Sequence, residues 1–236
     1  MKIRYDLKIV AKLVKENSTA LDIGCGDGEL LEFLKTNKKV DGRGIEISHI
    51  QVSNAIKKGL SVIHGDAEKD LIAYPDQSFE YAILSQAIQT MNHPKEIMIE
   101  MLRIAKYAII SLPNFAYYKN RLHLLLKGKM PINKIIPYQW YDTPNIHFCS
   151  IKDFKILCEE LNFIIKNEIF INSNQQLDKF ILLQKYSNLF AEYGVFLITK
   201  KEFKTGDQEE FAFKKDFVLG YKPLIPNPIF KSFKKN

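Results

Sequence analysis

Short apolar runs alternate with helix-like patterns through the first 112 residues, and no other feature constrains the fold of this chain as strongly. Strand, helix and strand in repeated succession are typical of a parallel sheet with crossover helices. The alternating part predicts strands at 19–23, 42–47, 60–65, 79–85 and 107–112. Two later strands are expected at 163–171 and 194–200, which completes the outline of a seven-stranded α/β sheet.

Signals at the helix ends agree with this alternation. Ser48 is a candidate N-cap and Gly59 a candidate C′ residue for the helix between them. Pro94 suits the first turn of a helix that runs to about Ile104. The remaining expected helices are an amphipathic one near the amino terminus, one ended by Gly128, one over 151–161 and a short one between 172 and 192.

The alternation breaks after residue 112. Residues 129–150, KMPINKIIPYQWYDTPNIHFCS, contain three prolines and four aromatic residues without clear periodicity. Long structured loops of this kind are more often functional than spacers, so we expect a lid-like excursion here. A chain of 236 residues can bury one substantial core. We therefore expect one α/β domain over 1–200 and a basic C-terminal extension over 201–236.

The net charge of +7 is concentrated near the carboxyl terminus. Nine Lys and five Asp or Glu lie within residues 200–236, which leaves only +3 for the rest of the chain. Lys outnumbers Arg by 30 to 4, whereas nucleic-acid readout favours the bidentate guanidinium of Arg. We therefore expect no dedicated nucleic-acid surface.

Cysteine usage and hydropathy indicate a cytoplasmic protein. Cys25, Cys149 and Cys158 form no CxxC pair, so neither a disulfide framework nor a bound metal is expected, and a reducing compartment fits. Charges interrupt the apolar residues of the first 17 positions, unlike a signal peptide. No stretch approaches the ~20 apolar residues that a membrane span needs.

The segment LDIGCGDGEL, residues 21–30, places three glycines at alternate positions from Gly24, directly after an apolar run. A dinucleotide-binding fingerprint needs glycine at its sixth position, where this chain has Glu29. The Gly-Lys-Ser/Thr of a phosphate-binding loop is absent. Asp22 and Asp27 would repel a pyrophosphate but favour a ligand that carries a sulfonium and an ammonium. Glycine spacing alone does not separate these ligands, but the missing residues and the two acids favour S-adenosylmethionine (SAM).

Acidic residues also follow the next two expected strands. Glu46 ends the second strand, where a carboxylate can accept hydrogen bonds from both hydroxyls of a ribose. Asp66 follows the third strand, where it can accept a hydrogen bond from an adenine amino group while Ala67 offers backbone contact. The carboxyl ends of parallel strands share one edge of an open α/β sheet, so Asp22 and these two acids are expected to line one site.

Several longer motifs resemble known families. LDIGCGDGEL, GIEI, GDAE and FEYAILSQAIQTMNHPKEIMIEMLRIAKYAIIS resemble the class I SAM-dependent methyltransferases. RYDLKIV, FEYAILSQAIQ, SLPNF and above all GKMPINKIIPYQWYDTPNIHFCSIKDF are similar to the MetW family of methionine-biosynthesis proteins, over about residues 3–199. Two features depart from that family: NFAYYKNR stands where Gly-His-Trp is usual after PNF, and the tail from Lys201 has no counterpart.

This resemblance implies a Rossmann-like sheet of strand order 3-2-1-4-5-7-6 with an antiparallel seventh strand and helices on both faces. It also implies SAM as the cofactor and homoserine O-acyltransferase as a protein partner in methionine biosynthesis. The loop, the acids and the resemblance together give the expected cofactor-binding residues, which are Asp22, Gly24, Cys25, Gly26, Gly28, Glu46, Ile47, Asp66, Ala67, Ser85, Gln86 and Ala87.

Methyl transfer needs in-line positioning and, for a hydroxyl or ammonium acceptor, a base. The candidate catalytic residues are His93, Asp142 and His147. Each has a structural alternative: a surface or capping role for His93, an Asx-turn for Asp142, and packing among the lid aromatics for His147. The Asn/Asp-Pro-Pro-aromatic stretch of DNA amino-methyltransferases is absent, because residues 85–88 are Ser-Gln-Ala-Ile.

Three functional hypotheses follow from the sequence. The first is a SAM-dependent methyltransferase on a small-molecule acceptor, with 129–150 as its lid. The second is a SAM-binding partner of the acyltransferase that supports or senses methionine synthesis and docks through the aromatic excursion. The third, a nucleic-acid or membrane-surface binder, rests on the basic tail alone. The motifs favour the first hypothesis at the level of fold, and the resemblance favours the second at the level of physiology.

Overall fold

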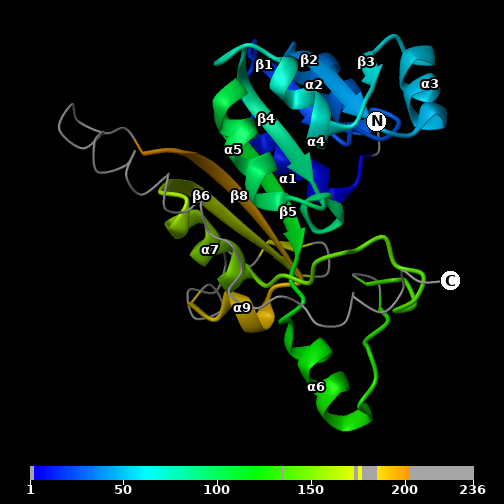
Figure 1. Cartoon of the computed structure of the whole chain (residues 1–236), viewed down its shortest axis with the longest axis vertical. Coiled ribbons are helices and arrows are strands. Elements are labelled where there is room, and N and C mark those ends of the chain that lie inside the picture. Colours follow the sequence, from blue (N-terminus) through cyan, green and yellow to red (C-terminus); the bar gives the residue numbers. More distant parts are fainter. Residues whose placement is uncertain (1–2, 134–135, 173–174, 177–184, 202–236) are drawn as a thin grey trace, which may run out of the picture. The chain divides into compact units, whose positions relative to one another are not determined.

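A mixed sheet forms the centre of the fold (Figure 1). The computed structural model describes residues 3–133, 136–172, 175–176 and 185–201. The strands lie side by side in the order β3-β2-β1-β4-β5-β8-β6-β7. Their bounds are β1 (Thr19–Ile23), β2 (Asp41–Glu46), β3 (Ser61–His64), β4 (Phe79–Ser85), β5 (Ala105–Pro113), β6 (Phe163–Asn172), β7 (Gln175–Gln176) and β8 (Tyr193–Lys200).

The strands from β1 to β5 pair in parallel, and β8 lies antiparallel between β5 and β6. Because β8 is the strand expected at 194–200, the predicted α/β order 3-2-1-4-5-7-6 is confirmed with β8 as its seventh strand. The two-residue β7 extends the sheet beyond β6. Two residues carry no periodicity, so the sequence did not predict this strand.

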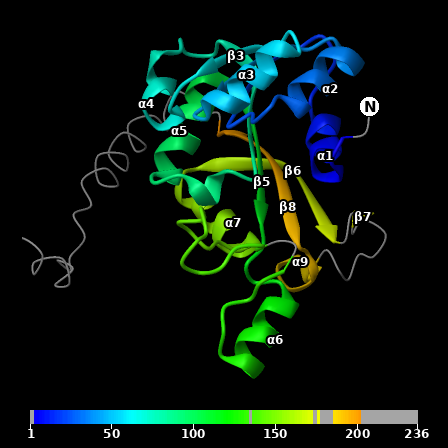
Figure 2. The same ribbon diagram turned by 90° about the vertical axis from the view of Figure 1, so that its right-hand side faces the viewer.

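Helices cover both faces of the sheet (Figure 2). The described helices are α1 (Tyr5–Leu13), α2 (Glu29–Lys38), α3 (His49–Lys57), α4 (Ala67–Asp70), α5 (Pro94–Ile104), α6 (Tyr118–Lys127), α7 (Ile151–Glu160) and α9 (Ser187–Phe190), with 3₁₀ turns η1 (Leu71–Ala73) and η2 (Ile88–Thr90). Alternate residues of a strand point to opposite faces. Accordingly, Ile83 of β4 packs with α1 and α2, whereas Leu84 packs in the cluster that contains α5 and α7.

The expected helix ends are present in the structure. Pro94 occupies the first turn of α5, and Gly128 ends α6 in the left-handed conformation at φ +57°. Ser48 is the N-cap residue of α3, although its hydroxyl makes no capping hydrogen bond. Ser150 caps α7 by a reciprocal pair, because its hydroxyl accepts from the Asp153 N–H and its own N–H donates to the Asp153 carboxylate.

The chain leaves the sheet after β5. Helix α6 projects from the end of the domain that lies opposite α2 and α3 (Figures 1 and 2). The described part of 129–150 contains no helix or strand, and its role as a lid stays a prediction. Met1–Lys200 forms one compact unit, and the predicted extension lies from residue 202 onward outside the described residues. No helix in the described part is long and apolar enough to cross a membrane.

Candidate functional site

The carboxyl ends of β1, β2 and β4 meet at one edge of the sheet. The glycine loop after β1 lies against residues that end or follow the other two strands. The Gly24 N–H donates to the Ile45 carbonyl at 2.8 Å, and a Cβ on Gly24 would lie 3.6 Å from the Cβ of Ala87. The edge therefore brings together the loop, Glu46 and the Ser85–Ala87 turn, which are the groups that an extended nucleoside ligand would contact.

Backbone conformation explains the three glycines of the loop. Gly24, Gly26 and Gly28 have φ values of +68°, +56° and +80°, in the left-handed region that favours glycine. An added Cβ at Gly28 would also overlap the side chain of Leu60, whereas one at Gly26 would meet nothing within 4 Å. Cys25 between them is buried, and burial raises the pKa of its thiol, so it serves packing rather than nucleophilic chemistry.

The Glu46 carboxylate holds the glycine loop from the end of β2. The Gly26 N–H donates to Oε2 at 3.0 Å, and the Ser48 N–H donates to Oε1 at 2.8 Å. Each carboxylate oxygen has more than one acceptor position. Glu46 can therefore fix the loop and still accept hydrogen bonds from the hydroxyls of a ligand.

Asp22 lies buried near the end of β1. Burial, and after it the neighbouring Glu46, raise the pKa of this carboxyl from 3.8 to about 7, with Arg4 opposing the shift. Among the described residues, no hydrogen bond reaches the Asp22 carboxylate. Desolvation disfavours the ionised form of this carboxyl, and a further cationic group beside it would favour that form.

The edge next to β3 carries a hydrogen-bonded carboxylate, that of Asp66, and two stacked histidine rings. Asp66 is the N-cap of α4, where it accepts a backbone N–H at 3.1 Å and pairs with Lys69 at 2.7 Å. The Asp66 oxygens, which were expected to accept a hydrogen bond from an adenine, therefore already contact a backbone N–H and Lys69. His49 and His64 stack at a centroid distance of 3.5 Å, and His64 Nε2 lies 2.9 Å from the carbonyl of the exposed Ile47.

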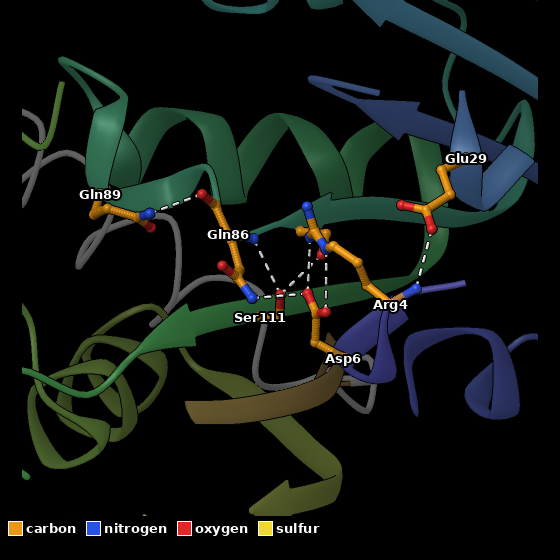
Figure 3. A network of polar contacts seen from close by, with 7 residues as sticks. Arg4, Asp6, Glu29, Gln86, Gln89 and Ser111 are labelled. Atoms are coloured by element: carbon orange, nitrogen blue, oxygen red, sulfur yellow. Dashed lines mark hydrogen bonds and ion pairs between the residues drawn. The ribbon is translucent and has the colours of Figure 1, made fainter. Parts of the chain in front are cut away.

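A polar network ties the amino-terminal helix to the turn after β4 (Figure 3). Gln86, at φ +53°, donates through Nε2 to Asp6 at 2.7 Å, and its backbone N–H donates to the Ser111 hydroxyl at 3.0 Å. Asp6 accepts two hydrogen bonds from the Arg4 guanidinium, at 2.9 and 3.2 Å. The Arg4 N–H donates to Glu29 at 3.0 Å. Helix α1 thus braces the turn that carries three expected cofactor-binding residues.

Gln89 attaches the 129–150 excursion to the same turn. Its Nε2 donates to the Gln86 carbonyl at 2.7 Å, and its own carbonyl accepts the N–H groups of Ile146 and His147 at 2.9 and 3.0 Å. Its side-chain Oε1 is buried and meets no donor in the described part of the chain. The carboxyl-terminal part of the excursion is therefore fixed to the edge that carries Gln86.

No hydrogen bond or ion pair among the described residues joins the three candidate catalytic residues. His93 is exposed, and its Nδ1 lies 3.2 Å from Glu68, a contact that joins α4 to the start of α5. Asp142 and His147 are both exposed, and the His147 N–H donates to the Gln89 carbonyl. Within the described ranges, no group of three or more His, Cys, Asp or Glu could hold a metal ion. Their catalytic roles stay predictions.

Arg4, Asp6, Gln89 and the stacked histidines were not singled out from the sequence. Arg4, Asp6 and Gln89 lie in the motifs RYD and LSQAIQ, which were visible only as parts of a family resemblance, and the two histidines lie in neither. Asp6 and Gln86 lie 80 positions apart. Local periodicity carries no information about such a pairing, which arises only when β4 and α1 come together in the folded sheet.

Comparison with known proteins identifies the family. A family model described as methionine biosynthesis protein MetW matches residues 4–198. This chain belongs to the MetW family. The bifunctional methionine biosynthesis protein MetXA/MetW of Rhodopirellula baltica is 31% identical to it over 182 residues, which cover 73% of this chain. The chain spans only 29% of that relative's length.

Solved structures share the fold of this MetW-family chain at low identity. A SAM-dependent methyltransferase from Archaeoglobus fulgidus matches with a TM-score of 0.59 and 18% identity, over 82% of this chain and 91% of that one. A SAM-dependent methyltransferase from Thermotoga maritima matches with a TM-score of 0.57 and 21% identity, over 84% of this chain and 88% of that one. The [4+2]-cyclase SpnF matches with a TM-score of 0.58 and 17% identity, over 82% of this chain and 80% of that one. The predicted class I fold is thus confirmed, and it is shared by a protein named for a different reaction.

Proposed function

We propose that this MetW-family protein binds SAM at the carboxyl edge of β1, β2 and β4, and acts with a homoserine O-acyltransferase in methionine biosynthesis. The observation that carries the SAM proposal is the buried Asp22 carboxylate beside Glu46. Two carboxylates at the mouth of a glycine loop favour a cation and disfavour a phosphate. SAM combines a sulfonium and an ammonium with a ribose that Glu46 can hold.

The remaining residues of the edge fit the same ligand. The Gly24–Gly28 loop leaves backbone close to Glu46 without side chains in the way. Ile47, Ala67 and the His49–His64 stack offer flat and apolar surface for a base. Ser85–Ala87, braced by α1, lie on the opposite side of the loop from β2. The expected cofactor-binding residues therefore form one continuous site in this proposal.

The acyltransferase part of the proposal is supported by the fused relative. A chain whose name joins MetXA to MetW keeps the two parts together at high effective concentration. A protein that instead consumes SAM would be a methyltransferase on a small-molecule acceptor; the Archaeoglobus and Thermotoga neighbours are both named as SAM-dependent methyltransferases, the second as a possible histamine N-methyltransferase. The two roles differ in their chemistry, because methyl transfer to a hydroxyl or ammonium group needs a base near the methyl donor, whereas a partner that only binds SAM needs none.

Calorimetric titration with SAM tests the binding site. Glu46→Gln replaces a charged hydrogen-bond acceptor of the site by a neutral one and weakens the contact between residue 46 and the loop. We therefore expect the dissociation constant for SAM to rise tenfold or more, which corresponds to about the free energy of one charge-assisted hydrogen bond. Glu160→Gln, which changes an exposed carboxylate of α7, is the matched control and leaves binding unchanged. Absence of SAM binding by the native chain would contradict the proposed cofactor.

Copurification with the acyltransferase of the same organism tests the partner. The purified complex is then assayed for homoserine acylation over a range of SAM concentrations. A rate that follows SAM occupancy, and is insensitive to SAM in Glu46→Gln, assigns SAM a regulatory role. Methyl transfer from labelled SAM to a small molecule, with no effect on acylation, would support the methyltransferase alternative instead.

A further inference from the structure

Helix α6 buries Asn120 and half-buries Leu124 on one side and exposes large apolar side chains on another. Asn120 is fully buried, where its amide donates to the Phe115 carbonyl at 3.1 Å and accepts from Asn133 at 2.7 Å. Four large side chains lie at spacings of i, i+4, i+7 and i+8, which place them on one face of the helix. This α6 stripe consists of Tyr118, Leu122, Leu125 and Leu126.

The α6 stripe is open to solvent. Leu125 is 80% exposed and Leu126 is 72% exposed. A surface helix ordinarily turns such a stripe toward the core, and a helix of only ten residues gains most of its stability from packing. In both views α6 projects from the domain (Figures 1 and 2). An outward apolar stripe on a projecting helix is typical of an element that inserts into a groove of a partner.

The charged residues on α6 and in the adjoining sequence are basic, whereas Glu192 lies against Tyr117 at the start of the helix. Lys119, Lys127 and Lys129 carry positive charge there, and the sequence contains no Asp or Glu between Glu100 and Asp142. Two copies docked stripe to stripe would bring these lysines together, and like charges across an interface are unfavourable. The complementary surface is therefore an apolar groove with an acidic rim on a different protein.

We propose that the α6 stripe docks into an apolar, acid-rimmed groove of the homoserine O-acyltransferase. This inference rests on the proposed function and assigns the contact surface. The relative that joins MetXA to MetW in one chain indicates the occupant, and the charge along α6 indicates the character of its surface. A standard interface takes roughly 800 Å² from each partner, so the stripe is the apolar anchor of a larger contact.

The test measures the dissociation constant of the full-length chain for the acyltransferase of the same organism. Leu125→Glu places a carboxylate in the anchor, and we expect affinity to fall at least tenfold, as for a central interface residue. Leu126→Ala adds no charge and lowers affinity in the same direction. Ile56→Glu is the matched control, because Ile56 is an exposed aliphatic residue on α3 at the other end of the domain. It leaves affinity within twofold of native.

The outcomes separate this inference from the function on which it rests. Equal binding of native chain and Leu125→Glu, with thermal melting and SAM titration unchanged, overturns the docking surface and leaves the partner in place. Failure of the native chain to bind the acyltransferase overturns both. A dimer measured by light scattering that dissociates in Leu125→Glu, or binding to vesicles with 30% phosphatidylserine that this substitution abolishes, would assign the stripe to a second copy or a membrane and overturn the proposal.

Discussion

The ionisation of Asp22 predicts a specific pH dependence of SAM binding. With a pKa of about 7 in the free protein, about one tenth of Asp22 is ionised at pH 6 and about nine tenths at pH 8. A cationic ligand beside it binds to the ionised form, which it then keeps ionised. We therefore expect the dissociation constant for SAM to be about tenfold higher at pH 6 than at pH 8.

The same shift affects stability in a defined direction. Because the folded pKa lies above the unfolded value of 3.8, the native state binds more protons between pH 4 and pH 7, and the free energy of unfolding falls as the pH rises through this window. The full shift corresponds to about 4 kcal/mol. Asp22→Asn removes the buried charge, so we expect this variant to be more stable than native at pH 8 and to bind SAM more weakly.

Calorimetry at pH 6 and pH 8, together with urea unfolding at both values, checks both expectations. SAM carries an amino group that titrates near pH 8. The Asp22→Asn variant lacks the carboxyl but binds the same ligand, so its pH dependence measures the contribution of the SAM amino group alone. Native dissociation constants that agree within twofold at the two pH values, after this correction, would refute the assignment of a buried and coupled charge at the end of β1. An Asp22→Asn variant no more stable than native at pH 8 would refute it independently.

Two further predictions concern the local conformation of the chain. Gly28→Ala forces a left-handed conformation on alanine and places its Cβ against Leu60, so we expect urea unfolding to show a free energy of unfolding lower by about 2–4 kcal/mol. Gly26→Ala has the same backbone strain but open space around its Cβ, so it should lower the free energy of unfolding by only about 1–2 kcal/mol. Equal losses in the two variants would contradict the overlap with Leu60. Ser150→Ala removes a capping hydrogen bond of α7 and should cost about 1 kcal/mol, whereas Ser48→Ala, whose hydroxyl makes no such bond, should cost less, and the reverse order would exclude the capping box.

Hydrophobic periodicity located the helices and strands because side-chain directions repeat regularly in each, so the buried face leaves a regular pattern in the sequence. Each strand expected from the sequence agrees with the observed strand to within two residues at either end. Pro94 and Gly128 marked helix ends because their backbone preferences are independent of tertiary context. The sequence of α6, by contrast, predicted a helix ended by Gly128 and not which of its faces is buried. The buried amide of Asn120 turns the α6 stripe outward, and the partners of that amide are set by the tertiary fold.

The candidate site divides in the same way. The positions of Asp22, Glu46 and Asp66 at one sheet edge followed from strand order alone. Their states did not, because burial and neighbouring charge decide whether a carboxylate is free or occupied. Asp66 is engaged by its own helix start and by Lys69, whereas Asp22 is buried with no such partner among the described residues. A sequence pattern identifies the acidic residues at the edge, and only the packed structure shows which of them are buried and which are hydrogen-bonded.

Binding of a cation and docking of a partner make separate demands on this fold. The first demands buried carboxylates beside open backbone, which the edge of β1 and β2 provides through Asp22 and Glu46. The second demands an uncovered apolar surface, which α6 provides at the other end of the domain. The two sets of residues lie at different ends of the domain, so Glu46→Gln and Leu125→Glu should each weaken one property and preserve the other. Exposed apolar patches commonly mark interaction sites, so we expect the α6 stripe to contribute to partner binding and not to SAM binding.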